Sequence, residues 1–465
     1  MKGKNLSDLI VERLTSYSSS LEFEDLPQEV VHQTKRLIID SLGCGLGAFN
    51  SEPSKSLRDM ASIFTGNLSA TVLGTSVRTT PDFAAFINGT MVRYLDFNDS
   101  YGGKDTAHPS DNIPIVMAAA EAYSSSGKDL ITGIVLAYEV QSAWADSFRL
   151  IDGGPWDQAV YAAISTPVGV GKVMGLTEDQ LSQAIRLSVV QGLAFLEARR
   201  GQISHWKACA VPNSGRNGIF AAMLAERGVT GPPAIFEGDH GFFVGATRGR
   251  VDLEMLASEE GNNRDFRIMK SCIKRFPAGF YSQTAIESAL EARKVLGIKS
   301  GKQVRNVHVL TFQNAIRAMA GDPSRWHPKT RETADHSIPY VIACALHFGS
   351  VEPKHFVEEM ISNPNLLTLM GKIKVSLDPD CDALWPEAVQ NIVTVETTEG
   401  REHTAITPHH LGHYQNPISD RGIEEKYRGL CKEHFSPKQS DESLKALWKI
   451  DELDDLRKMI KLLTI

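Results

Sequence analysis

A dense group of polar side chains lies in residues 94–111, between two apolar stretches. An imidazole in this segment could transfer a proton near neutral pH. A helix expected to begin near Pro109 would also turn its first backbone amides toward an anion. Because Ser, Asp and Gly are common in ordinary turns, the residue types support a structural turn and a catalytic anion site equally. The polar members are Asp96, Asn98, Asp99, Ser100, Lys104, Asp105, Thr106 and His108.

Three later strings add cations and further proton-transfer groups, mostly where a helix is expected to begin. A single such side chain is usually a satisfied structural group. Several together favour a cleft that binds carboxylates, because cations form strong charge-assisted hydrogen bonds with carboxylates. The strings supply His205 and Lys207, then Lys274 and Arg275, and finally Asp335, His336, Ser337 and Tyr340.

The sequence indicates neither a cofactor nor a metal site. Its six cysteines form no C-x-x-C pair, which argues against zinc and iron–sulfur sites. The glycine-rich strings at 43–47, 169–175 and 238–241 lack the G-x-G-x-x-G spacing and the strand context of a dinucleotide site. Three clustered histidines lack a helical i, i+4 arrangement, and we interpret them as a loop that returns to the first domain: His409, His410 and His413.

The groups above must be positioned by a region that is predicted to be helical from about residue 26 to 265. Its apolar residues recur at three- and four-residue steps. Thr177 and Gln180 have the spacing of a capping box ahead of one apolar stripe, and Ser214 is expected to begin another helix. Two further apolar stretches are too short to cross a bilayer and are predicted to be core helices: 113–123 and 130–140.

Beyond about residue 268 the apolar pattern changes to alternation, which is typical of strands. Strands are expected at 307–311 and 373–377 and in a hairpin over 392–406, with helices over 282–296, 335–349 and 352–362. The tail from 416 to 463 is helical again. We therefore predict a mainly α fold with an inserted α+β domain. Residues 1–267 together with 408–465 would form a large all-helical domain, and 268–407 a smaller α+β lid domain.

Composition and charge exclude several classes of protein. The 465 residues carry 49 Lys and Arg against 56 Asp and Glu, a net charge of −7. Such a chain has no global positive field to hold a phosphate backbone, so a nucleic-acid partner is not expected. No run of eighteen apolar residues predicts a membrane span, and the first residues lack the apolar region of a secretion signal. We expect a cytoplasmic protein without a membrane contact.

In this order along the chain, several of these strings resemble the MmgE/PrpD family. They are Leu95-Asp-Phe-Asn-Asp-Ser with His108-Pro-Ser, Gly201-Gln-Ile-Ser-His-Trp-Lys207-Ala, Ser214-Gly-Arg-Asn-Gly-Ile-Phe-Ala-Ala with Thr230-Gly-Pro, Glu332-Thr-Ala-Asp-His-Ser-Ile-Pro-Tyr340, and Gly412-His-Tyr-Gln-Asn-Pro. The Ile-Ser-x-Trp-Lys and Asp-His-Ser-x-Pro-Tyr forms look closest to the 2-methylcitrate dehydratase branch, rather than to the cis-aconitate decarboxylase branch.

The resemblance implies a cofactor-free homodimeric enzyme whose active site lies in the cleft between a helical domain and an α+β lid. His108 would transfer the proton, oriented by Asp96, and Tyr340 or Tyr281 would assist the leaving hydroxyl. Cations would stabilise charge that develops on a substrate carboxylate. The family positions carried over by motif are Asp96, Ser100, His108, Lys207, Lys274 and Tyr340, with His336 in the same motif as Tyr340 and Arg275 beside Lys274.

Two departures from the family pattern concern proton transfer. Gln158 and Tyr281 stand where dehydratase-like members usually carry histidines, and Gly279 stands where decarboxylases tend to carry another. Glutamine can hold a substrate oxygen but cannot transfer a proton near neutral pH, whereas tyrosine could act as an acid. We expect both side chains to contact the substrate.

These observations predict a cofactor-independent lyase that acts on a small di- or tricarboxylate and eliminates water from 2-methylcitrate or a related hydroxy acid. An epimerase or a decarboxylase would share the carbanion chemistry without a leaving hydroxyl. A non-catalytic carboxylate-binding relative remains a third alternative. Base and acid could be exchanged without changing anything that the sequence contains.

Overall fold

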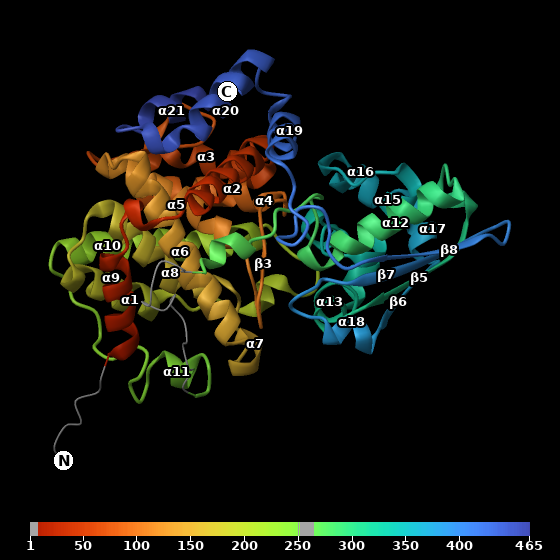
Figure 1. Ribbon diagram of the computed structural model, residues 1–465, viewed down its shortest axis with the longest axis horizontal. Helices are drawn as coiled ribbons and strands as arrows, with labels where there is room; N and C mark the ends of the chain where they lie inside the picture. The colour runs from red at the N-terminus through yellow and green to blue at the C-terminus, as the bar shows by residue number, and fades with distance from the viewer. Residues whose placement is uncertain (1–7, 250, 252–264) are drawn as a thin grey trace.

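The computed structural model describes residues 8–249, 251 and 265–465. A helical part and a part built on a small sheet lie side by side, joined by extended segments (Figure 1). The predicted fold class, mainly α with an α+β part, agrees with this architecture. Within the described residues no helix is both long and apolar enough to cross a membrane.

The helical part is built from long helices that pack face to face. All of them bury apolar side chains, and several are buried on nearly every side, which makes those helices core helices rather than surface helices. The two short apolar stretches of the sequence lie in α5 and α6, as predicted. The principal helices are α2 (Gln28–Gly47), α4 (Pro81–Tyr94), α5 (Asn112–Tyr123), α6 (Gly127–Ser147), α8 (Ala159–Met174), α9 (Glu178–Gln191) and α10 (Trp206–Glu226).

Local capping predicts the start of one of these helices and misplaces the start of another. Thr177 accepts from the Gln180 amide at the start of α9, which confirms the capping box. Ser214, in contrast, lies inside α10, which begins at Trp206 and continues through Pro212. The first turns of α10 are buried against α4 and α8, so tertiary packing outweighs the capping preference of Ser214.

The α+β part contains a four-stranded mixed sheet in the order β6-β5-β7-β8. β5 pairs in parallel with β6 and antiparallel with β7, and β7 and β8 form the predicted hairpin. Helix α12 packs on β7 and β8, and α15 packs on α12 (Figure 1). The bounds are β5 (Val304–Thr311), β6 (Ile373–Leu377), β7 (Asn391–Thr397), β8 (Glu402–Thr407), α12 (Gln283–Leu296) and α15 (Ile338–Phe348).

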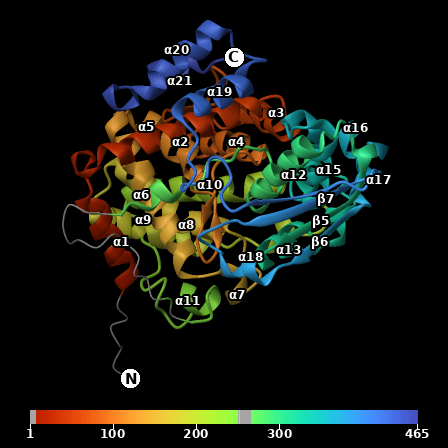
Figure 2. The ribbon, with the colours of Figure 1, turned by 45° about the vertical axis from the view of Figure 1, so that its right-hand side comes forward.

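The last helices return to the helical part, where α19 (Asp420–Cys431) and α20 (Pro437–Trp448) pack on α2 (Figure 2). The described part of the chain forms two large apolar cores. The larger contains side chains from Ile10 to Ile273 and again from Ile423 to Leu463, and the smaller runs from Cys272 to Val395. The chain therefore leaves the first core near residue 272 and re-enters it after the sheet.

Several shorter elements were not predicted, or differ from the prediction. The stretch over 352–362 is not one helix but a 3-10 turn followed by α16, because Val357 between them is extended. Two-stranded ribbons also appear in the helical part. The remaining elements are α1 (Leu9–Ser20), α3 (Glu52–Asp59), β1 (Ala70–Thr71), β2 (Arg78–Thr79), β3 (Tyr101–Gly102), β4 (Thr106–Ala107), α7 (Leu150–Gly153), α11 (Phe242–Gly245), α13 (Gln313–Met319), α14 (Arg331–Ala334), α16 (Glu358–Ile361), α17 (Pro364–Met370), α18 (Pro379–Ala383) and α21 (Arg457–Leu462).

Candidate active site

A cavity of about 190 Å3 lies where the two parts meet. It is smaller than the roughly 300–1,000 Å3 of pockets for drug-sized ligands, so it suits a small molecule. Its wall is rich in cations although the whole chain is acidic. Charged and polar residues on the wall include Arg93, Asp105, Thr106, His108, Arg149, Asp157, Gln158, Arg199, Arg200, Tyr281, Asn314, Arg317 and His336.

His108 is held in one tautomer by the polar loop that follows α4. Its Nδ1–H donates to the Asp99 carbonyl oxygen at 2.7 Å, and Ser100 Oγ lies 3.0 Å from the same nitrogen. Nε2 is therefore the nitrogen that carries a free lone pair. Burial, reinforced by the nearby charges of Arg93 and Lys274, lowers the pKa of His108 well below its usual range. The ring is thus a neutral proton acceptor on the cavity wall.

The expected anion site at the helix start near Pro109 is already filled by the chain itself. The Ser110 amide donates to Asp99 Oδ1 at 3.1 Å, and Tyr138 donates to Asp99 Oδ2 at 2.9 Å. Burial raises the pKa of Asp99 to about 6 in spite of these hydrogen bonds. These backbone amides therefore hold the loop that carries His108, and a substrate carboxylate must find other donors.

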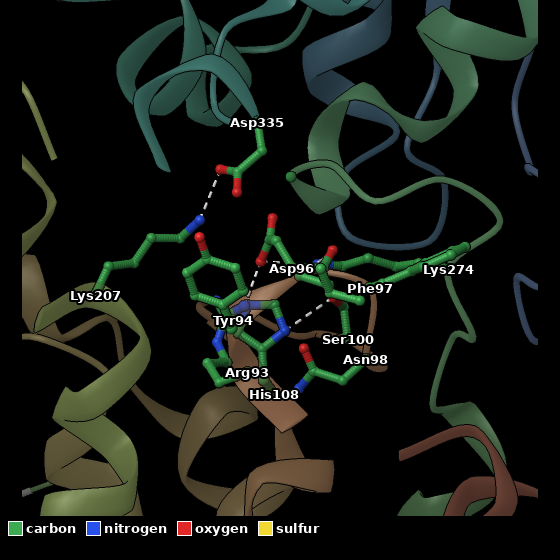
Figure 3. A network of polar contacts seen from close by, with 12 residues as sticks. Arg93, Tyr94, Asp96, Phe97, Asn98, Ser100, His108, Lys207, Lys274 and Asp335 are labelled. Carbon is green, nitrogen blue, oxygen red and sulfur yellow. Dashed lines mark hydrogen bonds and ion pairs between the residues drawn. The ribbon is translucent and has the colours of Figure 1, made fainter. Parts of the chain in front are cut away.

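Asp96 is buried, is not among the residues that line the cavity, and lies near the cations Arg93, Lys207 and Lys274 (Figure 3). It forms an ion pair with Arg93, and Lys274 Nζ lies 3.0 Å from its carbonyl oxygen and 3.2 Å from its Oδ1. Burial alone would raise the pKa of Asp96, but Lys207, Lys274 and Arg93 hold that pKa well below its usual range. Its backbone has a φ of 50°, a left-handed conformation that Asp tolerates better than most residues.

Lys207 and Asp335 join α10 to the segment after α14 across the boundary between the two parts (Figure 3). Lys207 Nζ lies 2.7 Å from Asp335 Oδ1, and Arg331 donates to the other oxygen at 3.1 Å. His336 Nδ1 lies 2.6 Å from Asp335 Oδ1, so Nδ1 carries the proton and Nε2 is free. Burial lowers the pKa of His336 to about 4, with Lys207 adding to the shift. The cavity wall therefore carries a second neutral imidazole.

One cluster of side chains has the composition of a metal site. Single ligand atoms of Asp96, Asp335 and His336 lie within 4.8 Å of one another. However, Lys207 Nζ is 2.7 Å from Asp335 and 3.0 Å from His336 Nδ1, and Arg93 and Lys274 pair with Asp96. The carboxylates are thus already matched by protein cations, and the cluster is better described as a buried ion-pair network.

Gln158 and Tyr281, the two positions that depart from the family pattern, both line the cavity. The Tyr281 hydroxyl lies 2.6 Å from Thr106 Oγ1, and its ring contacts Phe312 and Trp385 edge-on. Burial raises the pKa of Tyr281 far above its usual value, so it stays protonated. Tyr281 can therefore donate or accept a hydrogen bond, but it does not supply a phenolate.

Other residues singled out in the sequence lie away from this cavity. The Tyr340 side chain is buried in the smaller core, where its hydroxyl donates to the His355 carbonyl oxygen. Arg275 pairs with Glu287 at 2.9 Å on the surface and lines a different cavity. His205 lies at another surface hollow, 3.9 Å from Glu332. In this structure Tyr340 and Arg275 are therefore not in position to contact a ligand of the cationic cavity.

The structure adds arginines that the sequence analysis did not select. Arg149, Arg199, Arg200 and Arg317 all line the cavity. Arginine is common on every protein surface, and these four come from three separate segments, so spacing along the chain does not connect them. The sequence feature that could have pointed to them is the adjacent pair Arg199–Arg200, just before the string that begins at Gly201.

The fold and this cavity define a mainly helical protein with a small cation-rich cavity that two neutral imidazoles line. Comparison with known families agrees with that class. Residues 12–254 match the MmgE/PrpD N-terminal domain, and residues 276–450 match the MmgE/PrpD C-terminal domain. The chain belongs to the MmgE/PrpD family, as its motifs predicted.

Curated relatives carry two different activities. The human cis-aconitate decarboxylase is 25% identical over 98% of this chain and 94% of its own length. The 2-methylcitrate dehydratase of Salmonella typhimurium is 28% identical over 84% of this chain and 83% of its own. The 2-methylcitrate dehydratase of Cupriavidus necator is 25% identical over 94% of this chain and 92% of its own length. These relatives are lyases, and identity at this level does not select one reaction.

Proposed function

We propose that this chain is a lyase that eliminates water from a small hydroxylated di- or tricarboxylate, with 2-methylcitrate or a related acid as substrate. The supporting observation is the cavity between the two parts, where neutral imidazoles and several arginines meet. Elimination of water is redox-neutral and needs only a base, an acid and charge stabilisation. The proposal therefore requires no cofactor.

In the proposed reaction His108 Nε2 removes a proton from the carbon next to a substrate carboxylate. The electron pair of that C–H bond forms the new double bond while the hydroxyl leaves from the neighbouring carbon. A proton must reach the leaving oxygen, and the newly protonated His108 can deliver it, while the neutral His336 can accept a hydrogen bond at Nε2. Arginines around the cavity favour the negative charge that builds up on the carboxylate.

The buried ion-pair network is proposed to position the second imidazole. Asp335 accepts from His336 Nδ1–H and is itself held by Lys207 and Arg331. Lys207 and Lys274 are almost fully buried, so they act through these partners and not as surface cations of the pocket. Ser100 has the same kind of role for His108, because its Oγ lies 3.0 Å from Nδ1.

Decarboxylation is the second candidate, because one relative carries that activity over nearly the whole chain. It would break a C–C bond next to the same charge-stabilising groups and would need no leaving hydroxyl. Epimerisation would return the proton to the same carbon. A protein that only binds carboxylates would use the cationic wall and leave the imidazoles without a function.

A substrate screen separates these candidates. The full-length protein is incubated with 2-methylcitrate, citrate and cis-aconitate, and products are followed by absorbance of the conjugated double bond and by mass. We expect loss of water from 2-methylcitrate. Loss of CO2 from cis-aconitate would instead support the decarboxylase. Binding without turnover of any of the three acids would support the non-catalytic alternative.

A further inference from the structure

The arginines of the cavity fall into two groups by their partners. Arg93 pairs with Asp96 and lies 3.8 Å from Asp111, and Arg199 donates to both oxygens of Asp157 at 2.5 and 3.2 Å. The third, Arg149, donates to both oxygens of its neighbour Asp152 at 2.9 and 2.7 Å. These three guanidinium groups already have protein carboxylates beside them, so a ligand would have to compete for them.

Arg200 and Arg317 differ from these three. Both line the same cavity and are partly exposed, yet neither guanidinium group forms a hydrogen bond or ion pair with any residue that the structure describes. Two cavity amides, Gln158 and Asn314, likewise have free side chains within the described part of the chain. Two uncompensated guanidinium groups on one cavity wall create a positive field that only an anionic ligand neutralises.

The two arginines also come from different parts of the molecule. Arg200 follows the 3-10 turn Leu196–Arg199 in the helical part, and Arg317 lies on α13 of the α+β part. The imidazoles of His108 and His336 line the same cavity. One ligand could therefore reach the imidazoles with its reacting carbon and both guanidinium groups with its other ends.

We infer that Arg200 and Arg317 bind the carboxylates of the substrate that do not react, and that they select polycarboxylates over monocarboxylates. This inference rests on the proposed function for the class of ligand. Guanidinium groups bind carboxylates with two parallel hydrogen bonds, which gives direction as well as charge. Because the pair spans both parts, a polycarboxylate also ties the α+β part to the helical part.

Equilibrium binding tests the inference separately from turnover. The probes are propane-1,2,3-tricarboxylate and butyrate, titrated by ligand-observed NMR against the full chain and its Arg200→Gln, Arg317→Gln and doubly substituted variants. We expect each single change to weaken tricarboxylate binding roughly 10- to 100-fold, the effect of one charge-assisted contact, with butyrate binding unchanged. Arg305→Gln is the control, because Arg305 is exposed on β5 and pairs with Glu396.

Substitution by lysine gives a second test that keeps the charge. Arg200→Lys and Arg317→Lys should lose part of the affinity, because lysine cannot make the paired contacts. Unchanged tricarboxylate binding in the double glutamine variant would overturn the inference, and so would an equal loss for butyrate. Either result would leave the proposed function standing if the wild-type chain dehydrates 2-methylcitrate. If the wild-type chain turns over none of the acids but the glutamine variants selectively lose tricarboxylate binding, the inferred role of the two arginines is supported and the proposed function is refuted.

Discussion

At the scale of single residues, the protonation state of His108 predicts how kcat/KM depends on pH. A base must be unprotonated to act, and burial together with Arg93 and Lys274 lowers the pKa of His108 well below its usual range. Burial also lowers the pKa of His336 to about 4. We therefore expect kcat/KM to stay level as the pH falls from 8 to below 6, with no step near the ordinary histidine value of about 6.5.

At alkaline pH a different group is expected to limit the reaction. Burial lowers the pKa of Lys274 to about 8, although Asp96 opposes the shift. As the pH rises through this value Lys274 loses its charge, and Asp96 keeps fewer cations around it. The pH profile of kcat/KM should thus decline above about 8. An acid limb centred near 6.5 would contradict the neutral buried base.

The replacement of two family histidines gives a second expectation for single residues. Gln158 and Tyr281 both line the cavity, and Tyr281 bonds to Thr106 at 2.6 Å. If Gln158 and Tyr281 only adjust the activity of an enzyme that is still a dehydratase, the double variant Gln158→His with Tyr281→His should preserve or raise turnover of 2-methylcitrate. If the natural substrate is a different acid, the double change should lower turnover of that acid, because each wall residue suits its own transition state. Steady-state kinetics on both acids distinguishes the outcomes.

Some site residues could be found from sequence and others could not. His108, His336, Gln158 and Tyr281 were selected from motifs, and the structure brings all four to one cavity. Tyr340 shares a motif with His336, but it lies four residues further along, in α15, and its side chain is buried in the smaller core. Motif membership thus predicts a neighbourhood, whereas the direction of each side chain depends on helix phase and packing.

The arginines were missed for a related reason. Arg149 and Arg199 lie far apart in the chain of the helical part, and Arg317 joins them only when the α+β part packs against it. No local pattern marks them, since a surface arginine and a cavity arginine have the same sequence neighbours. Their role depends on which carboxylates lie nearby, and that requires tertiary structure.

At the scale of elements, the loop that links β8 to α19 has a strict conformational requirement. Gly412 has a φ of 102°, and a Cβ there would come within 2.0 Å of the Ile273 carbonyl oxygen. This approach lets the Ile273 amide donate to the Gly412 carbonyl oxygen at 2.8 Å. The contact fixes the loop against the segment that carries Lys274, so it bears on the site as well as on stability.

Substitution of this glycine should therefore destabilise the protein. Gly412→Ala combines left-handed strain with a backbone clash, and we expect the free energy of unfolding to fall by about 2–4 kcal/mol. Gly400→Ala is the matched control, because Gly400 has a φ of 79° but nothing within 4 Å of the added Cβ; about 1 kcal/mol is expected there. Equal losses in urea unfolding of the two variants would show that the clash is absent.

Periodicity predicted the elements of the α+β part better than those of the boundary between parts. The strands β5 and β6, the hairpin and α12 follow their apolar alternation or helical stripe closely. The start of α10 was misplaced because its first turns are held by packing and by the Lys207 ion pair rather than by a cap. Local signals fail where long-range contacts hold the backbone.

At the scale of the whole molecule, the two apolar cores support the proposal that residues 1–267 with 408–465 and residues 268–407 form two domains. The boundary between them is crossed by buried ion pairs such as Lys207–Asp335 and Lys274–Asp96. A cationic cavity lies at that boundary. The relative position of the two parts therefore determines whether the two imidazoles and the arginines can reach one ligand.

The surface of the helical part suggests how two copies could associate. Large apolar side chains are exposed on α10, at the end of α9, which packs beside α10, and on the segment after α9: Trp206, Phe220, Val190, Leu193 and Phe195. We propose that these side chains lie at the interface of the expected homodimer, because burying them would remove apolar surface from water. Light scattering should give the mass of two chains. Phe220→Asp should shift the mass toward one chain, whereas Val295→Asp, an exposed valine on α12, should not.

The most direct measurement for the central proposal is the initial rate of double-bond formation from 2-methylcitrate by the wild-type chain and by His108→Gln. Glutamine keeps a polar group at this position but cannot take up a proton near neutral pH. We predict turnover by the wild type and a rate lower by about 10²–10⁴-fold in the variant, the usual contribution of one general base. Equal rates in two equally folded proteins, or no product from the wild type, would contradict the proposal that His108 is the base of a dehydratase.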